Sequence, residues 1–283
     1  MIDTTFLDQL ARFGLVIHKR VTSSYIGPRK SIAAGRGMIF KDYREYVQGD
    51  DFRAIDWKIF ARTDDLYVKN YEEERNLVVH LLLDCSASMN FGKSITKFDF
   101  SSMLGVGFAY LALKENEKVM FSTFSETLDV FQPRRGMSQL ASMIFHLNNI
   151  KPNKESKFLD AITQYRRVIK SRALIVIFSD LLLSLDEIKE AFYLLGKNEV
   201  KIVQVLDPVE KNLTYEGDFN LIDSEVGSKL RTFISPKLRI EYQHQLDEHC
   251  AEIEKACTSL GIGYYQITTD TPIFDAFYKI LKR

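Results

Sequence analysis

Two apolar segments that each end on an aspartate constrain the fold of this chain more than any other feature. The first, "LVVHLLLD", ends at Asp84, and the second, "ALIVIFSD", ends at Asp180. Continuous apolar runs of this length are typical of strands that are buried on both faces, as in parallel sheets covered by helices. An acid that ends such a strand lies at the carboxyl edge of the sheet, where ligands bind in folds of this kind. The sequence therefore predicts a parallel sheet with two acids at one edge.

Segments with helical patterns separate the predicted strands. We expect strands in the ranges 77–84, 117–125, 127–133, 172–180, 199–208 and 261–269. We expect helices in the ranges 96–116, 137–150, 157–170, 185–198, 236–260 and 272–282. Strands that alternate with helices predict an α/β fold with a doubly wound, mostly parallel sheet. The stretch 211–235 alternates around Gly-containing turns, which predicts a β-hairpin insertion.

The N-terminal quarter has a different character. Residues 1–20 carry apolar residues near helical spacing, which predicts an amphipathic helix that docks on the body of the protein, with peripheral membrane association as the alternative. Residues 35–75 are dense in charge yet rich in aromatics, which predicts an ordered wrap of short strands and turns. We therefore divide the chain into residues 1–75 and an α/β domain of residues 76–283.

The charged residues of this N-terminal segment allow two interpretations. In the first, they form salt bridges that pin the wrap to the sheet, and Trp57 is buried. In the second, they form a docking face for a partner. The residues concerned are Arg44, Asp50, Asp51, Arg53, Asp56, Lys58 and Arg62.

Composition limits the classes of function. The 283 residues contain 38 Lys plus Arg and 38 Asp plus Glu, so the balanced charge argues against a general nucleic-acid binder. The three cysteines include no C-x-x-C pair, which favours a reducing compartment over a disulfide framework, and we expect a cytoplasmic protein. The N-terminus lacks a secretory signal pattern, and every apolar stretch is shorter than the roughly 20 residues that span a bilayer.

Hydroxyl side chains follow the first predicted strand end and also begin a later helix. Ser86 and Ser88 follow Asp84 at alternate positions, and Ser156 begins a predicted helix between the two acids. With Asp180 they make a set of two carboxylates and three hydroxyls, which suits Mg²⁺, Mn²⁺ or Ca²⁺ rather than zinc. Ser156 also fits the simpler role of a helix N-cap.

This pattern resembles the metal-ion-dependent adhesion site of von Willebrand factor A domains. That family has D-x-S-x-S after an apolar strand, a Thr in a later loop and an Asp after the fourth strand. "DCSAS" and "IFSD" match, and aligning "SKFLDAI" with the family's T-D-L-x-x-A-L places Ser156 at the Thr position. The resemblance implies a metal site formed by Asp84, Ser86, Ser88, Ser156 and Asp180.

The flanking segments are similar to a bacterial family known as domain of unknown function 58. The similarity lies in "YREYVQGDDFRAIDWKIFARTDDLYVKNYEEER", "DPVE", "IDSEVGS" and "GIGYYQITTDTP". Members of that family usually accompany MoxR-type AAA+ ATPases. The resemblance implies an adaptor role in chaperone or assembly work with such an ATPase and client proteins, and it implies no established catalytic activity.

Enzymatic alternatives fit the sequence less well. A phosphatase of the haloacid dehalogenase type would use Asp84 as nucleophile, but Ser86 stands where its general acid belongs. A metal-dependent hydrolase or nuclease would use Glu45, Asp56 and Lys58 in a segment that lacks a strand–helix core. The chain also lacks the G-x-x-x-x-G-K-[ST] phosphate loop. We therefore expect a binding protein rather than an enzyme.

Overall fold

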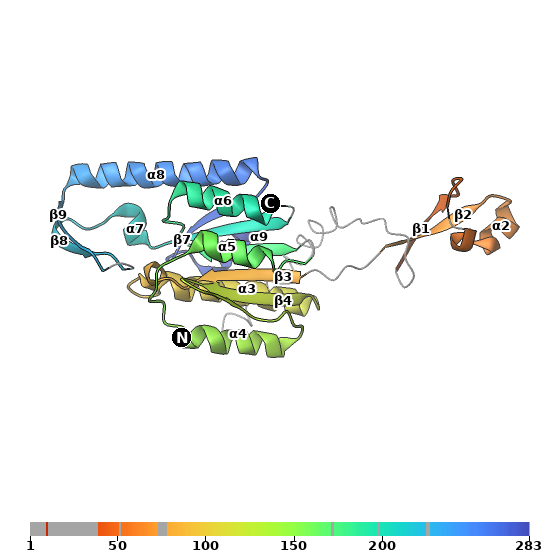
Figure 1. Cartoon of the computed structure of the whole chain (residues 1–283), viewed down its shortest axis with the longest axis horizontal. Helices are drawn as coiled ribbons and strands as arrows, with labels where there is room; N and C mark the ends of the chain where they lie inside the picture. Colours follow the sequence, from red (N-terminus) through yellow and green to blue (C-terminus); the bar gives the residue numbers. More distant parts are fainter. Residues whose placement is uncertain are drawn as a thin grey trace. The chain divides into compact units, whose positions relative to one another are not determined.

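The computed structural model of the chain describes residues 10, 39–50, 52–72, 78–170, 173–196, 198–224 and 227–282. The chain divides into two compact units, with β1 to β2 in the first and β3 to α9 in the second (Figure 1). Of the predicted helix at 1–20, only Leu10 is among the described residues; it is helical and buried. The rest of that prediction lies outside them.

The first unit is a short antiparallel strand pair with two helical turns between its strands. β1 (Ile39–Glu45) pairs with β2 (Tyr67–Glu72), and η1 (Phe52–Ala54) and α2 (Trp57–Thr63) connect them. This confirms the expected strand-containing segment. The predicted burial of Trp57 is wrong, because its side chain is 58% exposed at the start of a helix that buries none of its residues.

The second unit is built on a six-stranded sheet. Its strand order is β10-β7-β6-β3-β4-β5, and all neighbours are parallel except β4 and β5. The strands are β3 (Val78–Asp84), β4 (Lys118–Phe124), β5 (Leu128–Val130), β6 (Leu174–Ser179), β7 (Glu199–Leu206) and β10 (Gly263–Thr268). The central strands β3 and β6 are buried along almost their whole length, as their apolar sequences predict.

Helices cover both faces of this sheet, as a doubly wound fold requires (Figure 1). One layer contains α3 (Lys97–Lys114), α4 (Met137–Asn149) and α9 (Ile273–Leu281). The other contains α5 (Phe158–Arg166), α6 (Leu185–Leu195) and α8 (Pro236–Ser259). The predicted α/β class with a mostly parallel, doubly wound sheet is confirmed.

Close packing fixes the layers against the sheet. Leu82 points into the core under α5 and α6, and Leu83 on the opposite face meets α3 at Gly105. A Cβ on Gly107 would come within 2.1 Å of the Phe277 ring, so glycine lets α3 and α9 approach closely.

A hairpin extends from the chain after β7. β8 (Gly217–Ile222) pairs with β9 (Lys229–Ile234), which confirms the predicted insertion. It begins later than position 211, because α7 (Pro208–Asn212) comes first. Asp207 and Glu210 form a capping box at the start of α7, with Pro208 in its first turn. Within the described part of the chain, none of the helices combines the length and hydrophobicity that a bilayer crossing needs.

Candidate functional site

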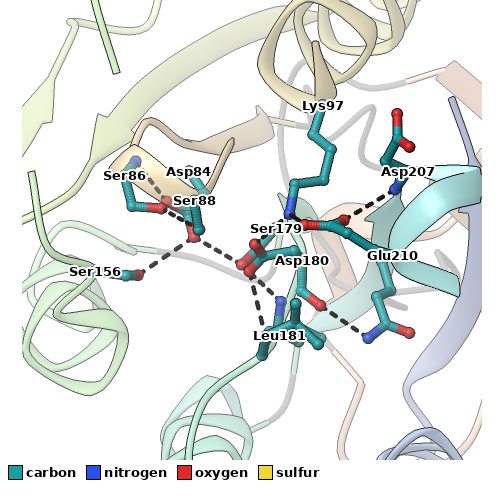
Figure 2. Close-up of polar contacts among 12 residues, drawn as sticks. Asp84, Ser86, Ser88, Lys97, Ser156, Ser179, Asp180, Leu181, Asp207 and Glu210 are labelled. Atoms are coloured by element: carbon teal, nitrogen blue, oxygen red, sulfur yellow. Dashed lines mark hydrogen bonds and ion pairs between the residues drawn. The ribbon is translucent and has the colours of Figure 1, made fainter. Parts of the chain in front are cut away.

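Asp84 is the centre of a polar cluster at the carboxyl edge of the sheet (Figure 2). It is the last residue of β3, and its exposed fraction is 0%. Its Oδ1 accepts a hydrogen bond of 2.9 Å from the Ser86 backbone N–H. Its Oδ2 accepts hydrogen bonds from the Ser179 hydroxyl at 2.7 Å and the Ser156 hydroxyl at 3.3 Å. Two hydroxyls and one backbone N–H, from three separate segments of the chain, therefore surround one buried carboxylate.

The loop after β3 holds the two serines of the D-x-S-x-S pattern side by side. Ser86 immediately precedes η2 (Ala87–Asn90), and its Oγ lies 3.1 Å from the Oγ of Ser88. The Ala87 N–H donates to the Lys154 carbonyl at 2.7 Å, which fastens this loop to the loop before α5. The backbone thus brings the serines of the first loop to the loop that carries Ser156.

Ser156 contributes to the cluster and does not act as the cap of α5. The residue at the N-cap position is Lys157, and the cap there makes no side-chain hydrogen bond. The Ser156 hydroxyl is instead directed at Asp84 (Figure 2). The alternative role of Ser156 as the N-cap of α5 is therefore wrong, and its role as a metal ligand stays a prediction.

Asp180, the fifth predicted residue, follows β6 and is nearly fully buried. Its Oδ1 accepts a hydrogen bond of 3.4 Å from the Leu182 N–H, and its backbone carbonyl accepts one of 2.8 Å from the Gln204 side chain. The next residue, Leu181, has a left-handed φ of 51°. A buried leucine rarely adopts this conformation, so the chain turns sharply where it leaves the sheet.

The ammonium group of Lys97 lies within the predicted site. Lys97 is the first residue of α3, and its exposed fraction is 0%. Its Nζ lies 2.8 Å from Oδ2 of Asp180 and 2.7 Å from Oε1 of Glu210 (Figure 2). The other carboxylate oxygen of Glu210 accepts a hydrogen bond of 3.0 Å from the Asp207 N–H in the capping box. One buried cation therefore joins Asp180 to α7.

Burial and like charge oppose the ionisation of Asp84. Burial and, to a smaller extent, the negative charge of Asp180 raise the pKa of Asp84, hydrogen bonds from Ser86 and Ser179 lower it, and the net result is a pKa of about 6. Burial also raises the pKa of Glu210, which the Lys97 ammonium partly offsets. The carboxylates of this edge are thus short of positive charge.

Lys97 supplies part of that charge. Burial lowers its pKa, but the ion pairs with Asp180 and Glu210 raise the pKa by more, so Lys97 stays protonated. When Asp84, Asp180 and Glu210 are all ionised, three carboxylates and one ammonium leave two negative charges in the cluster.

The donor set of the cluster fits a hard divalent cation. Asp84, Ser86, Ser88 and Ser156 supply only oxygen atoms, which Mg²⁺ and Ca²⁺ prefer. Two uncompensated negative charges match the charge of such an ion. Asp180 belongs to the same cluster, but one of its oxygens is already bonded to the Lys97 ammonium.

The residues of the hydrolase alternative have other roles in the first unit. The Asp56 side chain accepts a hydrogen bond from the Lys58 N–H at 2.9 Å and thereby caps α2. Its other oxygen accepts a hydrogen bond from the Tyr43 hydroxyl at 3.1 Å. Glu45 and the Lys58 side chain are exposed. Asp56 is therefore engaged as a helix cap.

Sequence reasoning missed three members of the cluster: Ser179, Lys97 and Glu210. Two signals could have indicated Lys97 and Glu210. A lysine at the first position of a helix faces the positive end of the helix dipole, so Lys97 needs a nearby anion. The sequence "DPVE" also matches a capping box, which would have placed Glu210 on a helix directly after β7.

The second unit combines a doubly wound sheet that has an antiparallel edge strand with an acid–serine cluster at the carboxyl edge of that sheet. Residues 42–252 match the family model described as protein of unknown function DUF58. The chain belongs to this family.

Two bacterial proteins that are similar in sequence to this chain are both described as uncharacterized. The uncharacterized protein Rv1480 of Mycobacterium tuberculosis is 25% identical over 266 residues, which cover 90% of this chain and 82% of that protein. The uncharacterized protein YeaD of Bacillus subtilis is 23% identical over 136 residues, 48% of this chain and 32% of that protein.

Among solved structures, BatB from Bacteroides thetaiotaomicron has a TM-score of 0.45 at 16% identity, covering 73% of this chain and 100% of that chain. An aerotolerance-related membrane protein from Bacteroides fragilis has a TM-score of 0.46 at 18% identity, with the same coverage.

Proposed function

We propose that this protein is a protein-interaction module that binds its partner through a divalent cation held by Asp84, Ser86, Ser88, Ser156 and Asp180. The observation that carries the proposal is the buried Asp84 carboxylate, which is surrounded by hydroxyl oxygens and lacks a cationic partner of its own among the contacts described. A bound cation would neutralise this cluster and offer an open coordination position to a carboxylate of the partner.

Exposed apolar side chains beside the site support binding to a protein. The Lys93 ammonium, in the loop that leads from the serines to α3, lies 5.3 Å from the ring centroid of Tyr215, just before the hairpin. The hairpin exposes Leu221 and Leu230, which pair across its two strands and therefore share one face. Apolar groups grouped on a small two-stranded sheet are typical of surfaces that contact other proteins.

The partner that we propose is a MoxR-type AAA+ ATPase, for which this protein would act as an adaptor in the assembly of client proteins. This part of the proposal rests on the resemblance of the charged N-terminal segment and "DPVE" to family members that accompany such ATPases. The proposal assigns no catalytic residue, and Mg²⁺ is the first cation to test, followed by Mn²⁺ and Ca²⁺.

The test measures binding to a purified MoxR-type ATPase in Mg²⁺ and compares two double variants. Ser86→Ala/Ser88→Ala removes two ligand oxygens without changing charge, and we expect it to abolish binding. The matched control is Ser142→Ala/Ser259→Ala, whose hydroxyls are exposed and donate only to helix carbonyls. We expect the control variant to bind like the wild type.

Calorimetry separates cation binding from partner binding. Asp84→Ala should abolish Mg²⁺ binding while the fold persists, as far-UV circular dichroism will show. EDTA also removes Mg²⁺ from the ATPase nucleotide, so the serine variant in Mg²⁺ decides the result. If that variant binds the ATPase as well as the wild type, the interface lies elsewhere and the proposal is wrong.

A further inference from the structure

Lys97 is placed where stability alone does not require a lysine. Its side chain is fully buried, and its position at the start of α3 is opposed by the helix dipole. Buried ion pairs are often no more stabilising than well-packed apolar side chains of similar volume. A lysine in this position therefore calls for a role beyond packing.

Its position relative to the proposed ligands indicates that role. The ammonium lies 2.8 Å from Oδ2 of Asp180, an oxygen that belongs to the proposed cation site. The same ammonium lies 2.7 Å from Glu210, which was not a proposed ligand. Lys97 thus places one positive charge inside the site and binds one carboxylate oxygen of Asp180. Glu210 balances that positive charge with one negative charge.

We propose that Lys97 and Glu210 set the affinity of the site for a divalent cation, with the Lys97 ammonium acting as a tethered competitor. This inference rests on the proposed function and deepens it, because it concerns the same site. With Lys97 and Glu210 both present, the cluster carries two negative charges. Loss of the ammonium leaves three, and loss of the Glu210 carboxylate leaves one.

The consequence is a site that binds its cation weakly enough to release it. Lys97 partly satisfies Asp180 when the cation is absent, so the metal-free protein stays folded. A cation that binds must share Asp180 with the ammonium, and its affinity is lowered accordingly. Binding of the partner can then respond to the divalent cation in solution, which a permanently filled site would prevent.

The experiment measures Mg²⁺ and Mn²⁺ affinity by calorimetry for Lys97→Met, Glu210→Gln and the double variant. A unit charge about 6 Å from a divalent cation changes the affinity roughly tenfold even when water screens it, and by more in a partly buried site. We therefore expect at least about tenfold tighter binding for Lys97→Met and at least about tenfold weaker binding for Glu210→Gln. The double variant, with its two negative charges restored, should bind within about threefold of the wild type.

The matched control is Lys154→Met. Lys154 lies on the loop bonded to the serine loop, but its side chain is half exposed and its ammonium is 3.6 Å from Glu126. Because water and salt screen an exposed charge, we expect this variant to change the affinity by less than about twofold. A change as large as that of Lys97→Met would show a general charge effect and overturn the specific role of Lys97.

The outcomes distinguish this inference from the proposed function. Unchanged affinity in Glu210→Gln and the Lys97 variants, with binding by the wild type, overturns the inference and leaves the proposed function standing. If Lys97→Met binds the divalent cation and the wild type does not, the Lys97 ammonium itself occupies the cation position in the wild type. That outcome supports the inference and overturns the proposed function. Absence of binding in all variants overturns both. If Lys97→Met does not fold, Glu210→Gln and the double variant decide.

Discussion

Two regions of the molecule pair carboxylates with a basic side chain, and they do so in opposite surroundings. In the first unit, Arg44 holds Asp50 through two hydrogen bonds of 2.7 Å, and both side chains are partly exposed. In the second unit, Lys97 holds Asp180 and Glu210 within the protein and has no exposed surface.

The carboxylates respond differently in the two regions. The hydrogen bonds from Arg44, and a further one from the Val47 N–H, lower the pKa of Asp50 to about 2. Burial, together with the negative charge of Asp180, raises the pKa of Asp84 to about 6. An exposed pair satisfied by one arginine favours the ionised acid, whereas a buried cluster short of positive charge opposes it. The second arrangement is the one that favours a further cation.

The largest expected difference concerns loss of the basic side chain in EDTA. Lys97→Met should lower the free energy of unfolding by about 3–5 kcal/mol, because it leaves the buried Asp180 carboxylate and the partly buried Glu210 carboxylate without their cation. Arg44→Met should affect the first unit slightly, because water replaces the guanidinium. Urea unfolding followed by far-UV circular dichroism reports the α/β unit, and fluorescence of the one tryptophan, Trp57, reports the first unit. If Lys97→Met and Arg44→Met lose equal amounts of unfolding free energy, the proposed difference between the buried and the exposed ion pairs is wrong.

The second expected difference concerns pH. The folded-state pKa of Asp84 is about 6 and its ordinary value is 3.8, so the folded protein binds more protons between these values. The free energy of unfolding in EDTA should therefore fall as the pH rises from about 4 to about 6, and it should stay at the lower value above pH 6.

Asp84→Asn should remove this loss of stability, because asparagine does not ionise. We expect the variant in EDTA to be more stable than the wild type at pH 7, by on the order of 2–3 kcal/mol, and to lose this advantage near pH 4. Urea unfolding at both pH values measures the difference. An Asn variant that is less stable than the wild type at pH 7 would contradict the electrostatic interpretation of the cluster.

The smallest expected effect concerns the exposed pair. Arg44→Gln should return the pKa of Asp50 toward 3.8, which NMR titration of its carboxyl resonance measures. In the wild type, the lowered pKa gives the first unit stability that is full above pH 3.8 and lost as the pH falls toward 2. Raising the salt concentration should weaken this pair and leave the Lys97 pairs unaffected. If the pKa of Asp50 stays near 2 in the variant, the hydrogen bond from the Val47 N–H, and not Arg44, is what lowers it.

The apolar patterns of the sequence predicted the sheet correctly. β3 and β6 are recognisable because both of their faces are buried, and the topology of a parallel sheet places the acids that end them at one edge. The spacing in the first loop indicated Ser86 and Ser88, whose hydroxyl oxygens lie 3.1 Å apart beside Asp84. These features depend on local sequence and on a general rule of parallel sheets.

The errors concern contacts between distant residues. Trp57 was predicted to be buried in the interpretation in which salt bridges pin the N-terminal segment to the sheet, but α2 has no buried residues. Lys97 resembles any lysine near a helix start, and its partners lie 83 and 113 positions away in the sequence. Periodicity and composition carry no information on which charged side chains will meet across such separations.

The long sequence separations within the site also determine when it forms during folding. Asp84 and Ser179 meet across 95 positions, and they do so only after β3 and β6 have paired in their parallel register. Contacts of such high contact order close late, because the loop entropy must be overcome first. A cation at this site would find its ligands assembled only near the end of folding. It would therefore slow the unfolding of the native protein and leave the folding rate almost unchanged.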